Sequence, residues 1–260
     1  AAGVNRISFG VQSARDTQLR TLGRPHSAKQ ARAAFAAARR AGFENISGDI
    51  MLALPHYTQA EFDETLELIE KGGATHISAY LLKIEPDSAF GKHPPEGLPT
   101  SDEAADFYLY AVEQLEHHGY RQYEISNFAR PGRASRHNLK YWTMQEYLGF
   151  GPGAHSDFGG RRFAYARDLS SYIRGEEHLS ESACPAPRER EEERVMLALR
   201  TAQGLDLSTL GEDTREAEAV LEECARHGLA QGGNGRWRLT PQGFLVSNAV
   251  IVRVLEALSL

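Results

Sequence analysis

Cysteine is nearly absent from this sequence of 260 residues, and its scarcity limits the metal chemistry that the chain can support. The two cysteines, Cys184 and Cys224, stand forty positions apart, so neither belongs to a C-x-x-C or C-x-x-x-C spacing that would grip a metal ion or a cluster. We expect both to be free thiols in a reducing compartment. The sequence therefore predicts no metal site within this chain.

Long apolar stretches and an excess of positive charge are also lacking. The longest apolar stretches, residues 50–55 and 248–255, are far shorter than the roughly 20 residues of a membrane-spanning helix, and no basic-then-apolar leader opens the chain. We therefore expect a cytoplasmic protein without a transmembrane segment. The formal charge of −6 argues against broad binding to nucleic acid, which needs an excess of Lys and Arg. Small molecules or proteins are the expected partners.

The first half of the sequence alternates between apolar runs and helix-forming segments. Residues 4–11, 45–54 and 76–84 are typical of strands, and two helices with capping-box starts, near residues 27–41 and 58–72, connect them. This order predicts parallel strands joined by crossover helices, and periodicity leaves both half a barrel and an open sheet as candidates. Three further segments are expected before the linker: a helix at 100–118, a short strand at 123–129, and an irregular Gly-rich and aromatic region at 131–168.

The composition changes at the Pro-Ala-Pro sequence of residues 185–187, so we expect one domain over residues 1–183 and a second over residues 184–260. Two helices, a small hairpin and a final helix in the second domain resemble a winged-helix fold, which often binds DNA. Residues 188–260 hold nine Arg, no Lys and twelve Asp plus Glu, a balance that disfavours contact with phosphate. A packing or lid domain is therefore the expected role, with no nucleic acid bound.

Three polar residues stand out in the first half of the chain. Asp49 interrupts an apolar strand, where an ionised carboxylate is costly unless it is paired or solvated. Gln12 and Arg24 flank the end of the first strand and the loop after it, where parallel α/β folds place groups that contact ligands. Hydrogen bonds at strand ends would account for the same residues, so the pattern alone leaves both a binding role and a structural role open.

A colinear series of motifs points to a known family. The motifs are GVNRISFGVQS (residues 3–13), LGRPH (22–26), AGFENISGDIM (41–51), HISAY (76–80), GYRQYEISNFA (119–129), HNLKYW (137–142) and LGFGPGAHS (148–156). Together they resemble the HemW/HemN family of radical-SAM proteins over essentially the whole chain. The HNLKYW block, with YEISNFA before it, resembles the haem-chaperone branch rather than the oxygen-independent coproporphyrinogen III oxidases.

The resemblance implies an α/β fold: a partial TIM-like radical-SAM barrel from its fourth strand onward, followed by the small winged-helix-like domain. Gln12, Arg24 and Asp49 match positions that contact S-adenosylmethionine, and Lys83 matches a position that contacts the same ligand through its backbone. The C-x-x-x-C-x-x-C loop that holds the [4Fe–4S] cluster of the family does not occur here, and the chain starts with Ala1 rather than Met. We therefore expect the cluster segment to lie upstream in the intact protein, and this fragment to be inactive as a radical-SAM enzyme.

Haem is the second ligand that the resemblance implies. His137 is the first candidate for iron contact and His155 the second, while Tyr141 and Trp142 can stack on a porphyrin face. Packing roles would also explain these side chains, which lie beside a Gly-rich loop. The expected function is haem binding and delivery, with haem-accepting proteins of the respiratory chain as partners. The alternative is an oxygen-independent coproporphyrinogen III oxidase of porphyrin biosynthesis.

Overall fold

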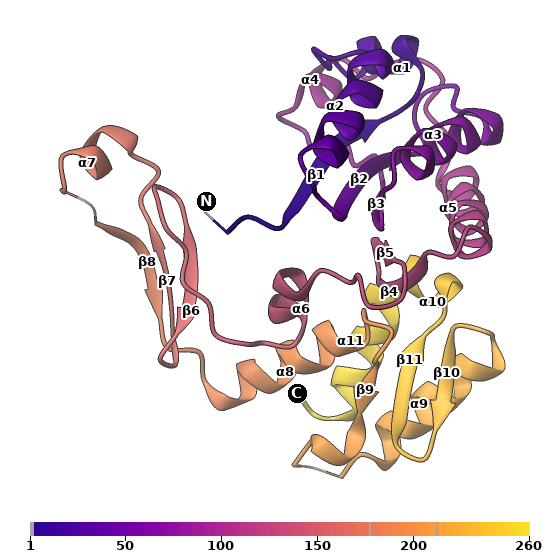
Figure 1. Cartoon of the computed structure of the whole chain (residues 1–260). Coiled ribbons are helices and arrows are strands. Elements are labelled where there is room, and N and C mark those ends of the chain that lie inside the picture. The colour runs from indigo at the N-terminus through magenta and orange to yellow at the C-terminus, as the bar shows by residue number, and fades with distance from the viewer. Residues whose placement is uncertain (1–2, 177, 212) are drawn as a thin grey trace. The chain divides into compact units, whose positions relative to one another are not determined.

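The computed structural model describes residues 3–176, 178–211 and 213–260, which fold into two compact units (Figure 1). Residues up to Ala134 form unit 1, and Ser135–Leu260 form unit 2. The predicted α/β class is confirmed, because strands and helices alternate through both units. None of the helices in the described ranges is long and apolar enough to cross a membrane.

Unit 1 is built on an open, mixed five-stranded sheet in the order β1-β2-β3-β5-β4. The three parallel strands are β1 (Arg6–Gln12), β2 (Asn45–Leu52) and β3 (His76–Leu81), and the two antiparallel ones are β4 (Arg121–Glu124) and β5 (Asn127–Ala129). The helices of unit 1 are α1 (Asp16–Thr21), α2 (Ala28–Arg40), α3 (Gln59–Lys71), α4 (Ala89–Lys92) and α5 (Ser101–His117).

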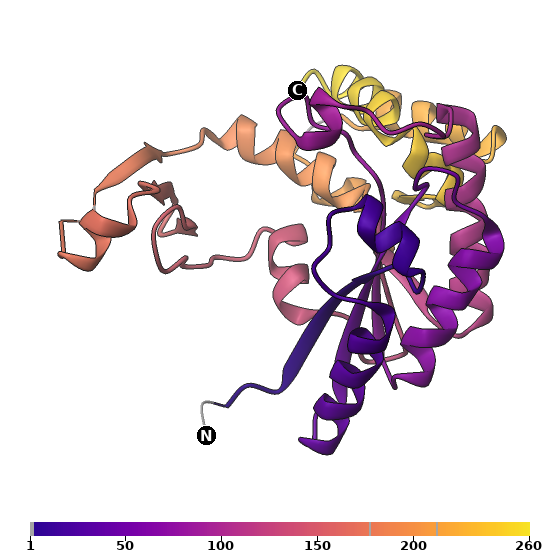
Figure 2. The same ribbon diagram turned by 90° about the horizontal axis from the view of Figure 1, so that it is seen from above.

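Strand alternation gives this sheet one apolar face and one polar face, because successive side chains point to opposite sides. Figure 2 shows the helices of unit 1 curving around one face of the sheet. Phe9 of β1 packs edge-on against Phe35 of α2, with 5.0 Å between ring centroids, and Ile50 and Ile77 are fully buried. The alternate positions project to the opposite face, where Ser8, Asp49 and Ser78 carry polar side chains.

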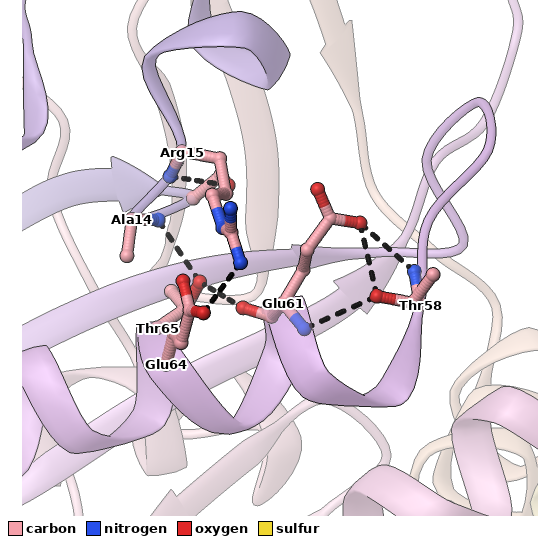
Figure 3. Close-up of polar contacts among 7 residues, drawn as sticks. Ala14, Arg15, Thr58, Glu61, Glu64 and Thr65 are labelled. Atoms are coloured by element: carbon pink, nitrogen blue, oxygen red, sulfur yellow. Dashed lines mark hydrogen bonds and ion pairs between the residues drawn. The ribbon is translucent and has the colours of Figure 1, made fainter.

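The loop that follows β1 is fastened to α3, which begins with a capping box formed by Thr58 and Glu61 (Figure 3). The Ala14 N–H donates to the Thr65 hydroxyl at 2.9 Å, and that hydroxyl donates in turn to the Glu61 carbonyl at 2.8 Å. Arg15 pairs with Glu64 at 2.5 Å on the same side of the helix. These contacts fix the chain as it leaves the carboxyl end of β1.

Unit 2 contains two three-stranded sheets within the described residues, in the orders β6-β7-β8 and β10-β11-β9. The strands are β6 (His155–Phe158), β7 (Arg161–Tyr165), β8 (Leu179–Ala183), β9 (Leu205–Asp206), β10 (Ala230–Gly233) and β11 (Arg236–Leu239). The helices are α6 (Arg136–Trp142), α7 (Leu169–Ile173), α8 (Pro187–Ala198), α9 (Arg215–Arg226), α10 (Pro241–Leu245) and α11 (Ser247–Ala257). The predicted boundary after residue 183 falls between β8 and α8 and stays a prediction.

Two local predictions were wrong. The segment 123–129 is not one strand but part of the β4–β5 hairpin, because the Glu124 carboxylate accepts the Ser126 N–H at 2.8 Å and turns the chain. The region 131–168, expected to be irregular, holds α6, β6 and β7. Gly159 and Gly160 both adopt positive φ, 60° and 74°, and this turn pairs β6 with β7.

Gly48 of β2 offers a test of how closely α3 packs on the sheet. A Cβ atom at this position would lie 2.9 Å from Cδ1 and from Cγ2 of Ile69. We expect Gly48→Ala to lower the free energy of unfolding by about 1–3 kcal/mol in a urea titration, because overpacking a filled core forces the helix or the strand to shift. In an Ile69→Ala background the same change should cost little. Equal costs in the two backgrounds would contradict this packing.

Candidate functional site

The polar face of the unit 1 sheet places Asp49 at its centre. The strand register sets Gly10, Asp49 and Ser78 opposite one another on β1, β2 and β3. Ser8 donates a hydrogen bond to Asp49 Oδ1 at 3.1 Å, and Ser78 is a second hydrogen-bond partner. Burial raises the pKa of Asp49 and outweighs the lowering by these two hydrogen bonds and by the charge of Arg6. The Asp49 carboxylate is therefore half-buried, and these hydrogen bonds and the Arg6 charge offset only part of the cost of burying its negative charge.

Tyr80 forms a hydrogen bond with one of the side chains that the sequence singled out in this unit and lies near two others. Its hydroxyl donates to Gln12 Oε1 at 3.1 Å and lies within the electrostatic influence of Asp49 and Arg24. Burial raises the pKa of Tyr80; Gln12 and Arg24 oppose that rise, and Asp49 adds to it. The structure thus brings Gln12 and Asp49 onto the sheet near Tyr80, with Arg24 close enough to influence the same hydroxyl. Tyr80 was not singled out from the sequence.

The backbone at Gln12 is unusual for a residue with a side chain. Its φ is +64°, the residue is 3% exposed, and the register between β1 and β2 shifts between Gly10 and Gln12. A non-glycine residue in the left-handed region carries a conformational cost, and such positions concentrate at binding sites. A Cβ on Gly10 would lie 3.0 Å from Gln12 Nε2, so this glycine leaves room for the amide.

Lys83 follows β3 on the surface, where its ammonium group pairs with Glu85 at 2.7 Å. The side chain is 82% exposed, and the hydrogen bond that its ammonium group donates to Glu85 raises the pKa of Lys83. This side chain is therefore engaged outside the polar face. Its backbone is therefore the part of Lys83 that could contact a ligand at the ends of the strands.

The groups at this strand edge match the polar atoms of S-adenosylmethionine. Arg24 is exposed and has no ion-pair partner among the residues that the structure describes, so its guanidinium is available for a carboxylate. The carboxylate of Asp49 and the amide of Gln12 can accept or donate hydrogen bonds to ribose hydroxyls or an adenine edge. The residues present therefore fit this ligand.

The described residues do not provide a set of ligands for an iron–sulfur cluster. Cys184 is exposed beyond β8, and Cys224 is buried in α9, where burial raises the pKa of its thiol. Across the described parts of the chain, no three His, Cys, Asp or Glu side chains are grouped so that they could hold a metal ion. No step is assigned to a cluster on these residues.

His76 is a buried titratable residue that the sequence reasoning did not single out. It is 2% exposed, with Nδ1 2.7 Å from the Ser47 hydroxyl and Nε2 2.9 Å from the Tyr123 hydroxyl. Burial, helped by the charge of Arg6, lowers the pKa of His76 to about 3. The imidazole is therefore neutral near pH 7, with a hydroxyl at each ring nitrogen. In the sequence, polar residues alternate with an apolar one at His76, Ile77 and Ser78, and this alternation was the signal that could have identified the histidine.

In unit 2, the helix α6 brings together two of the predicted haem residues. His137 and Tyr141 are one turn apart, both exposed, and Tyr141 Oη lies 2.8 Å from His137 Nε2. The rings meet edge to face at 5.1 Å between centroids. Tyr141 also packs on Tyr147 at 4.6 Å, so the pair is supported from the chain beyond α6.

Trp142 and His155 are placed differently from that pair. Trp142 is half-buried and lines a pocket of about 670 Å³ formed with residues of α8 and β9. His155 is exposed at the start of β6, where its carbonyl crowds Gly149 so closely that a Cβ there would lie 2.3 Å away. The four predicted haem residues thus form one contacting pair and two separate positions.

The β6–β7 hairpin is fastened to α8 by an ion-pair network around Asp157. Arg190 donates two hydrogen bonds to the carboxylate, from Nη1 at 2.5 Å and from Nη2 at 2.6 Å. Arg162 donates a third from Nε at 3.0 Å. These hydrogen bonds, Arg190 first, lower the pKa of Asp157. Arg162 also pairs with Glu193. Tyr147 exchanges two backbone hydrogen bonds with Asp157, which connects the α6 region to the same network.

Comparison with known proteins places the sequence in a family. Residues 1–69 match the Radical SAM superfamily and residues 186–246 match the HemN C-terminal domain. The chain is 36% identical to the Heme chaperone HemW of Bacillus subtilis over 264 residues, covering 96% of this chain and 69% of that protein. The chain belongs to the HemW family.

Other relatives of the HemW family agree with this assignment. The Heme chaperone HemW of Synechocystis is 35% identical, over 90% of this chain and 58% of that protein. A bovine protein named radical S-adenosyl methionine domain-containing protein 1, mitochondrial, is 42% identical over 61% of this chain and 36% of its own length. The chain spans about two thirds of the length of its bacterial HemW relatives.

A solved structure supports the fold. Coproporphyrinogen III oxidase (HemN) from Escherichia coli, described as a radical SAM enzyme, superimposes with a TM-score of 0.78 over 97% of this chain and 64% of that one. The sequences are 20% identical, so the likeness establishes a shared fold and nothing about substrates.

Burial of neutral His76 predicts a dependence of stability on pH. The folded pKa of about 3 lies below the ordinary value of 6.5, so between these values the unfolded state binds a proton that the folded state rejects. Stability should therefore fall as the pH drops from 6.5 towards 3, by up to about 1.4 kcal/mol per pH unit from this residue. Urea titrations of the wild type and His76→Gln should show a stability difference that shrinks on acidification.

The exposed residue His117 provides the matched control for that experiment, because His117→Gln should follow the wild type at every pH. A difference in unfolding free energy between the wild type and His76→Gln that stays constant from pH 7 to pH 4 would contradict this prediction. It would show that His76 takes up a proton as readily in the folded protein as in the unfolded one.

Proposed function

We propose that this chain binds haem and delivers it to other proteins. The observation that carries the proposal is the exposed His137–Tyr141 pair on α6, in which the Tyr141 hydroxyl lies 2.8 Å from His137 Nε2. The bacterial relatives named Heme chaperone HemW support it, since they match nearly the whole chain.

His137 is the residue proposed to hold the haem iron, through Nε2. Bound haem supplies an iron with an axial position that a neutral imidazole can fill. Tyr141 Oη lies 2.8 Å from the same nitrogen, so iron binding at Nε2 displaces this hydrogen bond, while Tyr147 keeps Tyr141 beside the histidine by edge-to-face packing. His155 is the second proposed contact, at the start of the neighbouring hairpin.

The oxidation of coproporphyrinogen III is not favoured as the function. The likeness to the Escherichia coli oxidase rests on fold alone at 20% identity, whereas the relatives that are 35% and 36% identical are named haem chaperones. In the intact protein we propose a [4Fe–4S] cluster held by residues outside this chain, haem-accepting respiratory proteins as partners, and a cytoplasmic location.

The strand ends of unit 1 are proposed to bind S-adenosylmethionine. Arg24 pairs with the methionyl carboxylate, while Asp49 and Gln12 hydrogen-bond to the ribose or the adenine, and the backbone of Lys83 contributes a further contact. The parallel part of the sheet supports the proposal that β1 to β3 are the fourth and following strands of a partial radical-SAM barrel. The helices and the β10–β11 hairpin after residue 184 support a winged-helix-like domain.

Haem binding is tested by titrating haem and following the Soret band. We expect saturation at about one haem per chain, and a loss of the histidine-dependent shift in His137→Ala, because the axial nitrogen is gone. His155→Ala should weaken binding less. His227→Ala, which removes an exposed histidine at the end of α9, serves as control and should leave the titration unchanged.

If His137→Ala and His155→Ala both leave the Soret titration of the wild type unchanged, the proposed iron contact is wrong. In that case the His137–Tyr141 pair is a structural element of α6.

Calorimetric titration with S-adenosylmethionine tests the site of unit 1. We expect weak binding to this chain, because the contact to a cluster iron is lacking and only part of the ligand's polar groups are paired. Arg24→Gln should reduce the affinity roughly tenfold or more through loss of a charged hydrogen bond, and Arg20→Gln, in the exposed part of α1, should not. Micromolar binding that survives Asp49→Ala would contradict the assignment.

A further inference from the structure

The pocket beside Trp142 is open to solvent on one side, and the proposed iron contact does not use it. Its volume of about 670 Å³ lies within the range of small-molecule sites, and α6, the β6–β7 hairpin, α8 and β9 all contribute to its lining. One aromatic side chain, Trp142, and three arginines, Arg190, Arg194 and Arg236, line it. His137 is not part of this lining.

Three arginines and three acidic residues line the pocket, and among the described residues Arg194 and Glu146 are the two of them without an ion-pair partner. Arg190 is held by Asp157, and Arg236 by Asp206. Glu146, a third acidic lining residue, accepts the Gly159 N–H at 2.8 Å.

Arg194 lies on the exposed side of α8. Within the described residues, its hydrogen-bond partner is the Thr209 carbonyl at 3.4 Å, a long contact to an uncharged group. A guanidinium with spare donors at the wall of a pocket is suited to bind a carboxylate in a two-pronged arrangement.

The walls of the pocket are fixed before any ligand arrives. The bidentate Asp157–Arg190 pair holds the hairpin to α8, and the backbone bonds between Tyr147 and Asp157 hold the segment after α6 to the hairpin. Because these walls are already ordered, little conformational entropy is lost when a ligand binds. More of the free energy of the contacts is then available as binding affinity.

We propose that this pocket binds the carboxylate-bearing edge of a porphyrin, with Arg194 pairing with a propionate and the Trp142 indole contacting the flat macrocycle. The inference rests on the proposed function, that the chain handles haem. It goes further in assigning a site that recognises the organic ring and its acid groups rather than the iron. Because Trp142 lines the pocket and His137 does not, this site works without the metal.

Iron-free protoporphyrin IX is the probe that isolates this site, because it cannot be ligated by histidine through iron. We expect saturable binding, followed by porphyrin fluorescence, that weakens roughly tenfold or more in Arg194→Gln. Arg226→Gln, an exposed arginine at the end of α9, should bind as the wild type does. Glu146→Gln should bind more tightly, because a repelling carboxylate leaves the pocket, which is a gain that damage to the fold would not produce.

The dimethyl ester of protoporphyrin IX supplies the complementary change on the ligand. It should bind the wild type about as weakly as protoporphyrin binds Arg194→Gln, and Arg194→Gln should not weaken it further. His137→Ala should bind protoporphyrin as the wild type does, while its haem titration loses the Soret shift.

These measurements separate the two assignments. Equal binding of protoporphyrin by wild type and Arg194→Gln, or of acid and ester by wild type, overturns the pocket assignment whatever the haem titration gives. A haem titration insensitive to His137→Ala overturns the iron contact while leaving a positive result at Arg194 intact.

Discussion

The parallel register of β1, β2 and β3 is the constraint on which unit 1 depends. It sets Gly10, Asp49 and Ser78 side by side and sends their apolar neighbours to the helix-covered face. A slip of one residue in β2 would turn Asp49 into the core under α3 and expose Ile50, which is fully buried. The site at the strand ends and the core behind it are therefore two sides of the same pairing.

Much of unit 1 could be predicted from the sequence, because its signals are local. Capping boxes at Ser27, Thr58 and Thr100 mark helix starts that the structure confirms. Gln12 and Asp49 could be singled out because each stands at the end of a strand or interrupts one. The hydrogen bond from Tyr80 to Gln12, by contrast, joins residues 68 positions apart, and no local pattern carries that information.

Unit 2 was harder to predict for the same reason. The contact between His137 and Tyr141 depends on α6, a helix in the segment that the sequence analysis expected to be irregular, so their spacing of four did not predict it. The pocket at Trp142 depends on Asp157 and Arg190, which are 33 positions apart, and the hairpin that presents Asp157 is built on a turn of two glycines in a segment with few other strand signals. The predicted haem residues were identified from the family resemblance, because no local pattern in this segment points to them.

The hydrogen bond between Tyr141 and His137 bears on the iron contact that we propose at His137. In the imidazole tautomer with its proton on Nδ1, the lone pair of Nε2 that accepts the Tyr141 hydroxyl is the same one that an iron atom would take. Under the proposed contact, the tyrosine hydroxyl and the iron would compete for one lone pair, and the hydroxyl would return to Nε2 when the iron leaves. Such a replacement would favour exchange of haem over storage.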